Sequence, residues 1–246
     1  MIYEEGLEAI AASESAFGQI SALCALTPES VDSPSGRVRR VAVGVVAAMV
    51  RTKAYRGMLT AAHLGTFESL LSAVLGERDR PRTAEAEGEG ERAGTPRETG
   101  SFDFATVDDC ATIIFSASAS QDHRALFVAG GTMVPLLCRV AGHVARTTRD
   151  WALPRTCYAA LIFMAQSNSA REAMGANIEH ILYPLTHCTT GSDTLVSAAS
   201  PTLVRPGTGV AGGAVDDSLL YTRRMVTRLL SILIAHKALQ PEVLLD

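Results

Sequence analysis

Apolar residues recur every three or four positions along most of this chain, which is the spacing of a helix with one buried face. Near the N-terminus, for example, Leu7, Ile10, Phe17 and Ile20 follow this spacing roughly. The pattern predicts helices over residues 4–26 (one or two), 37–52, 53–75 (a pair broken near Gly65), 108–118, 122–146 (a pair), 151–166, 169–188 (a pair) and 216–237. We therefore expect an all-α protein.

Two stretches interrupt the helical pattern. Residues 76–101 consist mainly of Glu, Arg, Gly, Thr and Pro and contain no Leu, Ile, Val, Phe or Met, whereas residues 189–215 are rich in Ser, Thr, Gly and Pro. Such segments bury too little apolar area to offset an ordering cost of ~1–2 kcal/mol per residue. We predict that both are disordered insertions within a single domain, residues 1–246. The first is more simply a passive loop than a regulated one with a phosphorylation site at Thr95.

A short motif recurs along the chain. Arg124 begins a segment that reaches Gly130, and Arg171 begins a similar segment that reaches Asn177, with 47 positions between corresponding residues. A looser copy begins at Arg56. A repeat of this length is typical of helical solenoids, whose stacked units usually provide a binding surface.

Each unit of the pattern consists of two short helices followed by one long helix. This triplet, with Gly or Asn between the short helices, resembles the armadillo repeat, most closely over residues 121–188. The resemblance implies a right-handed helical solenoid of about four three-helix repeats. We expect the turn between the short helices to place Gly130 and Asn177 at a positive φ, which costs least for these two residue types.

Composition and charge narrow the class of protein. The chain has 47% apolar residues, 20% charged residues and a net charge of −4, so it lacks the basic character of nucleic-acid-binding proteins. The N-terminus shows no signal-peptide pattern, and the apolar run at residues 41–50 is about half of the ~20 residues that cross a bilayer. The five scattered Cys are typical of buried thiols in a reducing compartment. We expect a soluble, cytoplasmic protein with no nucleic-acid or membrane partner.

The sequence contains no motif of a familiar catalytic or cofactor site. It has neither a Gly-rich phosphate loop nor a G-x-S-x-G elbow. The one local cluster of ligand types is His180, His187 and Cys188, and a metal site needs three or four convergent ligands. We interpret the histidines as ordinary residues of helix surfaces or interfaces. No cofactor, no metal and no catalytic residue are therefore expected.

The resemblance also indicates which residues face the concave surface of the array. In the armadillo proteins that carry nuclear-import cargo, the third helix of each repeat presents Asn and Trp along this surface. At the positions that correspond to this Asn, the present chain has Ala48, Ser116, Phe163 and Ile232. At those that correspond to the Trp, it has Gly44, Thr112, Ala159 and Arg228. Because these Asn places lack the amide groups that grip a peptide backbone, we do not expect import of basic peptides.

We expect instead a semi-apolar concave site with basic edges. Its floor is predicted around Phe163 and Ile232. The basic residues at its edges are predicted to be Arg40, Arg155, Arg224 and Arg228. The alternative is that these arginines simply cap or solvate the long helices.

These observations predict a non-catalytic adaptor or scaffold that binds a partner protein or peptide along its surface. Two narrower functions suit a protein of this size and class. One is a co-chaperone that acts as a nucleotide exchange factor on Hsp70-type chaperones, and the other is a docking or assembly factor for a microtubule-based complex. An enzyme is the least expected alternative.

Overall fold

The computed structural model describes residues 2–27, 32–76, 103–147, 151–186 and 217–236. Every regular element in these ranges is an α-helix, which confirms the prediction of an all-α protein. The helices are α1 (Ile2–Ala11), α2 (Glu14–Cys24), α3 (Pro34–Arg51), α4 (Lys53–Arg56), α5 (Ala61–Gly76), α6 (Phe104–Ser118), α7 (Gln121–Ala129), α8 (Met133–Thr147), α9 (Ala152–Met164), α10 (Asn168–Gly175), α11 (Ile178–Thr186) and α12 (Asp217–Ala235). The two predicted insertions lie outside the described residues, except for Gly76 at the end of α5.

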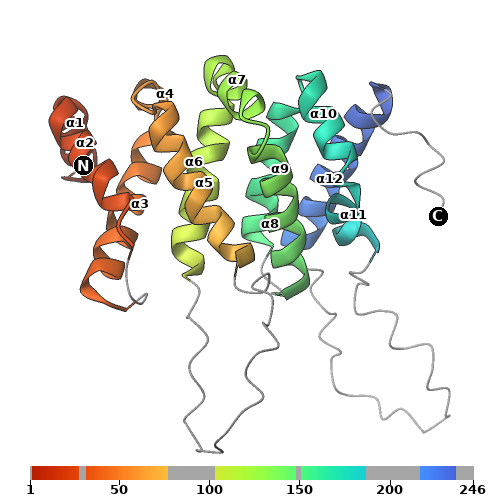
Figure 1. Cartoon of the computed structure of the whole chain (residues 1–246), viewed down its shortest axis with the longest axis horizontal. Helices are drawn as coiled ribbons and strands as arrows, with labels where there is room; N and C mark the ends of the chain where they lie inside the picture. Colours follow the sequence, from red (N-terminus) through yellow and green to blue (C-terminus); the bar gives the residue numbers. More distant parts are fainter. Residues whose placement is uncertain (1, 28–31, 77–102, 148–150, 187–216, 237–246) are drawn as a thin grey trace, which may run out of the picture.

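The helices are arranged in rows along the length of the molecule (Figure 1). The helices α3, α6, α9 and α12 each contact the next one and form what we call the long-helix row. A second row contains α5, α8 and α11, which contact α6, α9 and α12 respectively. The short helices α4, α7 and α10 lie along the upper edge in Figure 1, and α2 packs against α3 at the N-terminal end. In chain order, the described helices therefore form four groups of three.

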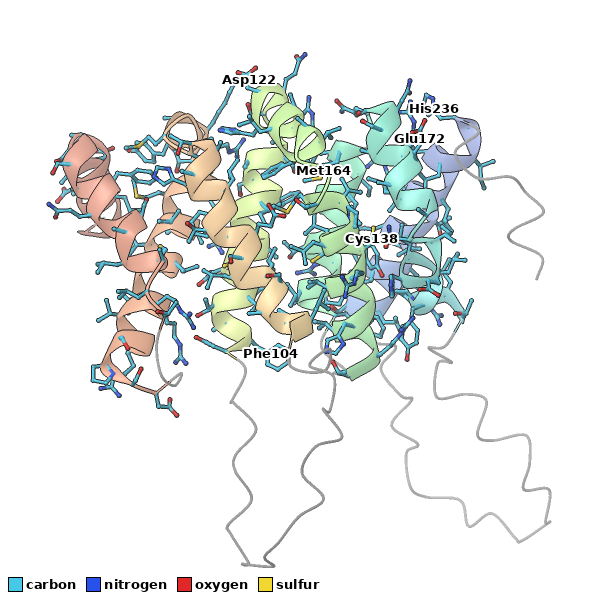
Figure 2. All side chains as sticks on the ribbon, in the orientation of Figure 1. Phe104, Asp122, Cys138, Met164, Glu172 and His236 are labelled. Carbon is cyan, nitrogen blue, oxygen red and sulfur yellow. The ribbon has the colours of Figure 1, made fainter. Side chains whose placement is uncertain are left out.

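The core lies between the long-helix row and the row of α5, α8 and α11. Figure 2 labels Cys138 of α8 and Met164 of α9 in this interior, and both are fully buried. The helices also approach closely where α8 crosses α11. A Cβ placed at Gly142 of α8 would lie 2.9 Å from the Cβ of His180 of α11, so this contact requires a residue without a side chain.

The recurring arginines end the long helices. Arg56 donates hydrogen bonds from its guanidinium to carbonyls of the last turn of α3, including that of Val50 at 2.9 Å. Arg124 does the same at the end of α6, where the carbonyl of Ser118 is 2.9 Å away. The last carbonyls of a helix have no partner within the helix and carry partial negative charge, so a cation stabilises them.

Arg171 completes this series at the end of α9. Its Nη1 donates to the carbonyl of Ala165 at 2.6 Å, and its Nη2 donates to Oδ1 of Asn168. Although it is an arginine, it is only 6% exposed. In all three cases the bonded carbonyl lies six positions before the arginine, so the sequence repeat corresponds to a repeated helix cap. We call Arg56, Arg124 and Arg171 the capping arginines.

The turn between α7 and α8 differs by one residue from the expectation. Gly131 has a φ of +71°, whereas Gly130 has a φ of −69°. The prediction that Gly130 adopts a positive φ is therefore wrong. Its N–H still bonds to the carbonyl of Leu126 at 3.1 Å, so the chain leaves the helical conformation only at the next residue. At the corresponding place after α10, Asn177 donates from Nδ2 to the carbonyl of Ala173 at 2.8 Å.

The predicted break near Gly65 is also wrong. The chain breaks earlier, between α4 and α5, and Gly65 lies inside α5. An exposed glycine within a helix costs only about 1 kcal/mol relative to alanine. Burial of Leu64, Phe67 and Leu71 along α5 outweighs this cost.

The prediction that Asp108 and Asp109 begin α6 places the start of this helix too late. The helix starts at Phe104, and Asp103 is its N-cap. Asp103 accepts hydrogen bonds from the backbone N–H of Thr106 at 3.4 Å and from the hydroxyl of the same residue. Because a capping carboxylate satisfies N–H groups that have no partner within the helix, the first suitable aspartate sets the start.

Replacing Arg171 tests the capping arginines. We expect Arg171→Met to lower the free energy of unfolding by about 1.5–3 kcal/mol, because methionine keeps the apolar stem but leaves a buried carbonyl without its charged donor. Urea denaturation followed by circular dichroism measures the change. Arg224→Met is the matched control, since Arg224 is exposed and should change stability by less than about 0.5 kcal/mol. Equal effects of the two substitutions would contradict the capping role.

Two glycine substitutions test the contact between α8 and α11. Gly142→Ala should destabilise the protein by about 1–3 kcal/mol, because the added methyl group meets His180. Gly65→Ala adds the same methyl group to α5, where no atom lies within 4 Å, and should stabilise the protein by about 0.5–1 kcal/mol. Thermal unfolding of both variants gives the comparison, and a neutral Gly142→Ala would show that the helices do not approach this closely.

Candidate partner-binding groove

A groove of about 480 Å³ crosses the long-helix row and involves all four of its helices. Its volume is within the range of roughly 300–1,000 Å³ that is usual for ligand pockets. Its lining includes Arg51 of α3, Thr112, Phe115 and Ser116 of α6, Arg155, Ala159 and Phe163 of α9, and Tyr221, Met225 and Arg228 of α12. The cavity therefore results from the side-by-side packing of these helices and not from a single loop.

A second cavity of about 420 Å³ adjoins the first toward the end of α12. The two cavities share Ile162, Phe163 and Arg228, and the second adds Ile232 and His236. We call the two together the long-helix groove. It runs from α3 to the last turn of α12.

Aromatic side chains form much of the floor of the long-helix groove. The rings of Phe115 and Phe163 lie 5.8 Å apart between centroids, at a tilt of 43°. Tyr221 is 51% exposed, and the guanidinium of Arg155 lies 5.7 Å from the centroid of its ring. This distance is that of a cation–π contact, which holds the arginine at the rim of the groove.

The long-helix groove is positively charged. Arg51, Arg155 and Arg228 line its larger cavity, and no Asp or Glu of the described residues lines either cavity. Among the described residues, no carboxylate lies within ion-pair distance of these three arginines. The nearby Asp109 is half-buried. Burial and the neighbouring Asp108 raise the pKa of Asp109, and Arg51 lowers it.

Four of the six predicted site residues line the long-helix groove. Arg155, Phe163, Arg228 and Ile232 lie there, as the helical face assigned to them predicts. Arg224 is exposed on α12 but lines neither cavity.

Several groove residues were missed by the sequence analysis. Tyr221 and Met225 lie seven and three positions before Arg228, so all three share one face of α12. Extending the predicted concave face of this helix toward its N-terminus would have identified both residues. Phe115 lies directly before Ser116, which is the residue of α6 that was predicted to face the concave surface. No sequence pattern identifies Arg51 as a groove residue, because it is the last residue of α3 and lies beyond the predicted positions on that helix.

Arg40 has a different role from the predicted one. Its Nε donates to Oδ2 of Asp103 at 2.7 Å, and this ion pair joins the second turn of α3 to the N-cap of α6. Burial alone would raise the pKa of Asp103, but the hydrogen bonds from Thr106 and Arg40 together lower it. Arg40 therefore lines neither cavity, and it pairs with the aspartate that caps the neighbouring helix.

Other ionisable side chains do not assemble into a reactive site in the described part of the chain. Burial raises the pKa of Cys24 and Cys138 to about 12, and it also raises the pKa of Cys110 and Cys157, so these thiols stay protonated. No group of three or more His, Cys, Asp or Glu side chains there could hold a metal ion. The predicted ligand types His187 and Cys188 lie outside the described residues.

Within the described ranges, no single helix is both long and apolar enough to cross a membrane. The pair α7 and α8 reaches the required length and apolar character only when joined, and it is bent by 88° at its junction.

No family model, no curated protein and no solved structure matches this chain. Its function is therefore proposed from its own residues and their geometry.

The ion pair between Arg40 and Asp103 predicts a pH dependence of stability. Because folding lowers the pKa of Asp103 from its ordinary 3.8, the ionised carboxylate stabilises the fold above about pH 4 and loses this effect as the pH falls through the lowered value. Asp103→Asn keeps a capping oxygen but has no charge to titrate. The variant should therefore be less stable than the parent at pH 7, and the gap should narrow below pH 4. Urea midpoints across this pH range measure it, and a gap independent of pH would contradict the prediction.

Proposed function

We propose that this protein is a non-catalytic adaptor that binds a partner protein or peptide in the long-helix groove. The observation on which the proposal depends is that the exposed Tyr221 and partly exposed aromatic and apolar side chains share this groove with arginines that form no ion pair with a carboxylate among the described residues. Exposed apolar surface rimmed by polar groups is typical of interaction sites. Tyr and Arg are also enriched among the residues that contribute most to binding energy.

The proposed architecture is an armadillo-like solenoid of about four three-helix units. Three features support it: the four groups of three helices, the successive contacts within the long-helix row, and the capping arginines at the ends of α3, α6 and α9. In such an array each unit contacts only its neighbours, and one surface extends across several units. The right-handed twist of the array stays a prediction.

Binding is a better account of the long-helix groove than catalysis. Among the described residues, the lining of the larger cavity contains no His, Cys, Asp, Glu or Lys, and Tyr221 is its one potential general acid or base. His236 lines only the smaller cavity, at the end of α12. The two narrower functions, a co-chaperone for an Hsp70-type chaperone and a docking factor for a microtubule-based complex, would both use a protein-binding surface and stay predictions.

A charge reversal in the groove tests the proposed function. The tagged protein is purified from its own cells under gentle conditions, and its partners are compared with those of the double variant Arg155→Glu/Arg228→Glu. We expect the variant to lose the main partner, because both substitutions change the rim of the groove. Arg224→Glu is the matched control: it reverses one charge on α12 outside the groove and should keep the partner.

The proposed function is contradicted if the groove variant retains the same partner in the same amount as the parent. Loss of the partner by both the groove variant and Arg224→Glu would place the contact on the outer face of α12 instead. Circular dichroism of all three proteins shows whether they remain folded.

A further inference from the structure

We infer that the segment bound in the long-helix groove is an acidic peptide that inserts an apolar or aromatic side chain between its carboxylates. This inference rests on the proposed function and adds the chemistry of the partner.

The charge of the groove points to the carboxylates. Three arginines from three different helices, Arg51, Arg155 and Arg228, line a cavity to which the described part of the chain contributes no Asp or Glu. The whole chain has 26 acidic and 22 basic residues, so this positive site runs against the net charge of −4. A guanidinium binds a carboxylate through two parallel hydrogen bonds, and this geometry favours carboxylate partners. An acidic segment complements this site, whereas a basic one meets repulsion.

The positions of the arginines also favour a defined ligand. Arg155 is held against the ring of Tyr221, so less side-chain freedom is lost when it binds a carboxylate. Burial raises the pKa of the half-buried Asp109 and the charge of Arg51 lowers it, so Arg51 already interacts with a carboxyl group of this chain. We therefore expect Arg155 and Arg228 to contribute more to binding than Arg51.

The floor of the groove indicates the apolar side chain. Phe115 and Phe163 form a tilted aromatic pair there, and Met225 of α12 lines the same cavity. Burial of an apolar side chain against such a floor is favourable, and it adds to the binding that carboxylates obtain from the arginines. A nucleic acid offers negative charge and flat bases too, but its phosphates usually require a more extensive basic surface than this acidic protein has.

Selection from a library of random linear peptides displayed on phage tests the inference. The full-length protein is the bait, and the double variant Arg155→Glu/Arg228→Glu is the parallel bait. We expect peptides enriched by the parent to carry Asp or Glu on both sides of Leu, Phe or Trp. The variant should not enrich them.

The binding of one enriched peptide is then measured by fluorescence anisotropy. Changing its acids to the corresponding amides should weaken binding roughly fivefold or more, as should the Arg155→Glu/Arg228→Glu variant. Arg224→Glu should bind with an affinity close to that of the parent. Raising the salt concentration to about 0.5 M should weaken the parent's binding, because exposed ion pairs are screened.

The outcomes separate this inference from the proposed function. If enriched peptides depend on the groove arginines but show no excess of Asp and Glu, the partner is a peptide and the acidic chemistry is wrong. If a single-stranded oligo(dT) binds the parent more tightly than the selected peptide and loses binding in the double variant, the groove binds nucleic acid and the inference is overturned. If no peptide is enriched above a bare-matrix control, the proposed peptide-binding function fails together with the inference.

Discussion

The architecture of this protein depends on a cation that closes the C-terminal end of three successive long helices. The last carbonyls of a helix have no partner within the helix and need one from outside it. Arg56, Arg124 and Arg171 supply these partners at α3, α6 and α9, each from the short helix that follows. The same interaction therefore ends one unit and positions the first helix of the next. This explains why arginine is the most visible element of the repeat.

Once the long helices end at equivalent places, they can lie side by side over their whole length. One face of the long-helix row packs against α5, α8 and α11 and forms the core. Another face keeps Phe163, Tyr221 and their neighbours available at the long-helix groove. The capping arginines donate to backbone carbonyls at helix ends, whereas Arg51, Arg155 and Arg228 line the larger cavity. Arg171 belongs to the first set and also lines the smaller cavity.

The fold could be predicted from the sequence where the signal is periodic. The spacing of 47 identified Arg124 and Arg171 as equivalent, but not their role, because their partners are backbone carbonyls that leave no trace in the sequence. The resemblance to the armadillo repeat also placed Phe163 and Arg228 on the concave surface, and both line the groove. It failed for Arg40, whose partner Asp103 lies 63 positions away and follows a long insertion. Contacts between distant segments depend on packing, which a single sequence does not encode in a readable pattern.

Site-specific photo-crosslinking tests the central claim most directly. A photoreactive amino acid replaces Tyr221 in the long-helix groove or, in a matched protein, Leu126 on α7, and these residues are 51% and 45% exposed. Illumination in the protein's own cells captures whatever lies within bond-forming distance. The account predicts one dominant crosslinked protein from position 221 and none from position 126. The same product from both positions, or a product from position 126 alone, would contradict a partner bound in the groove.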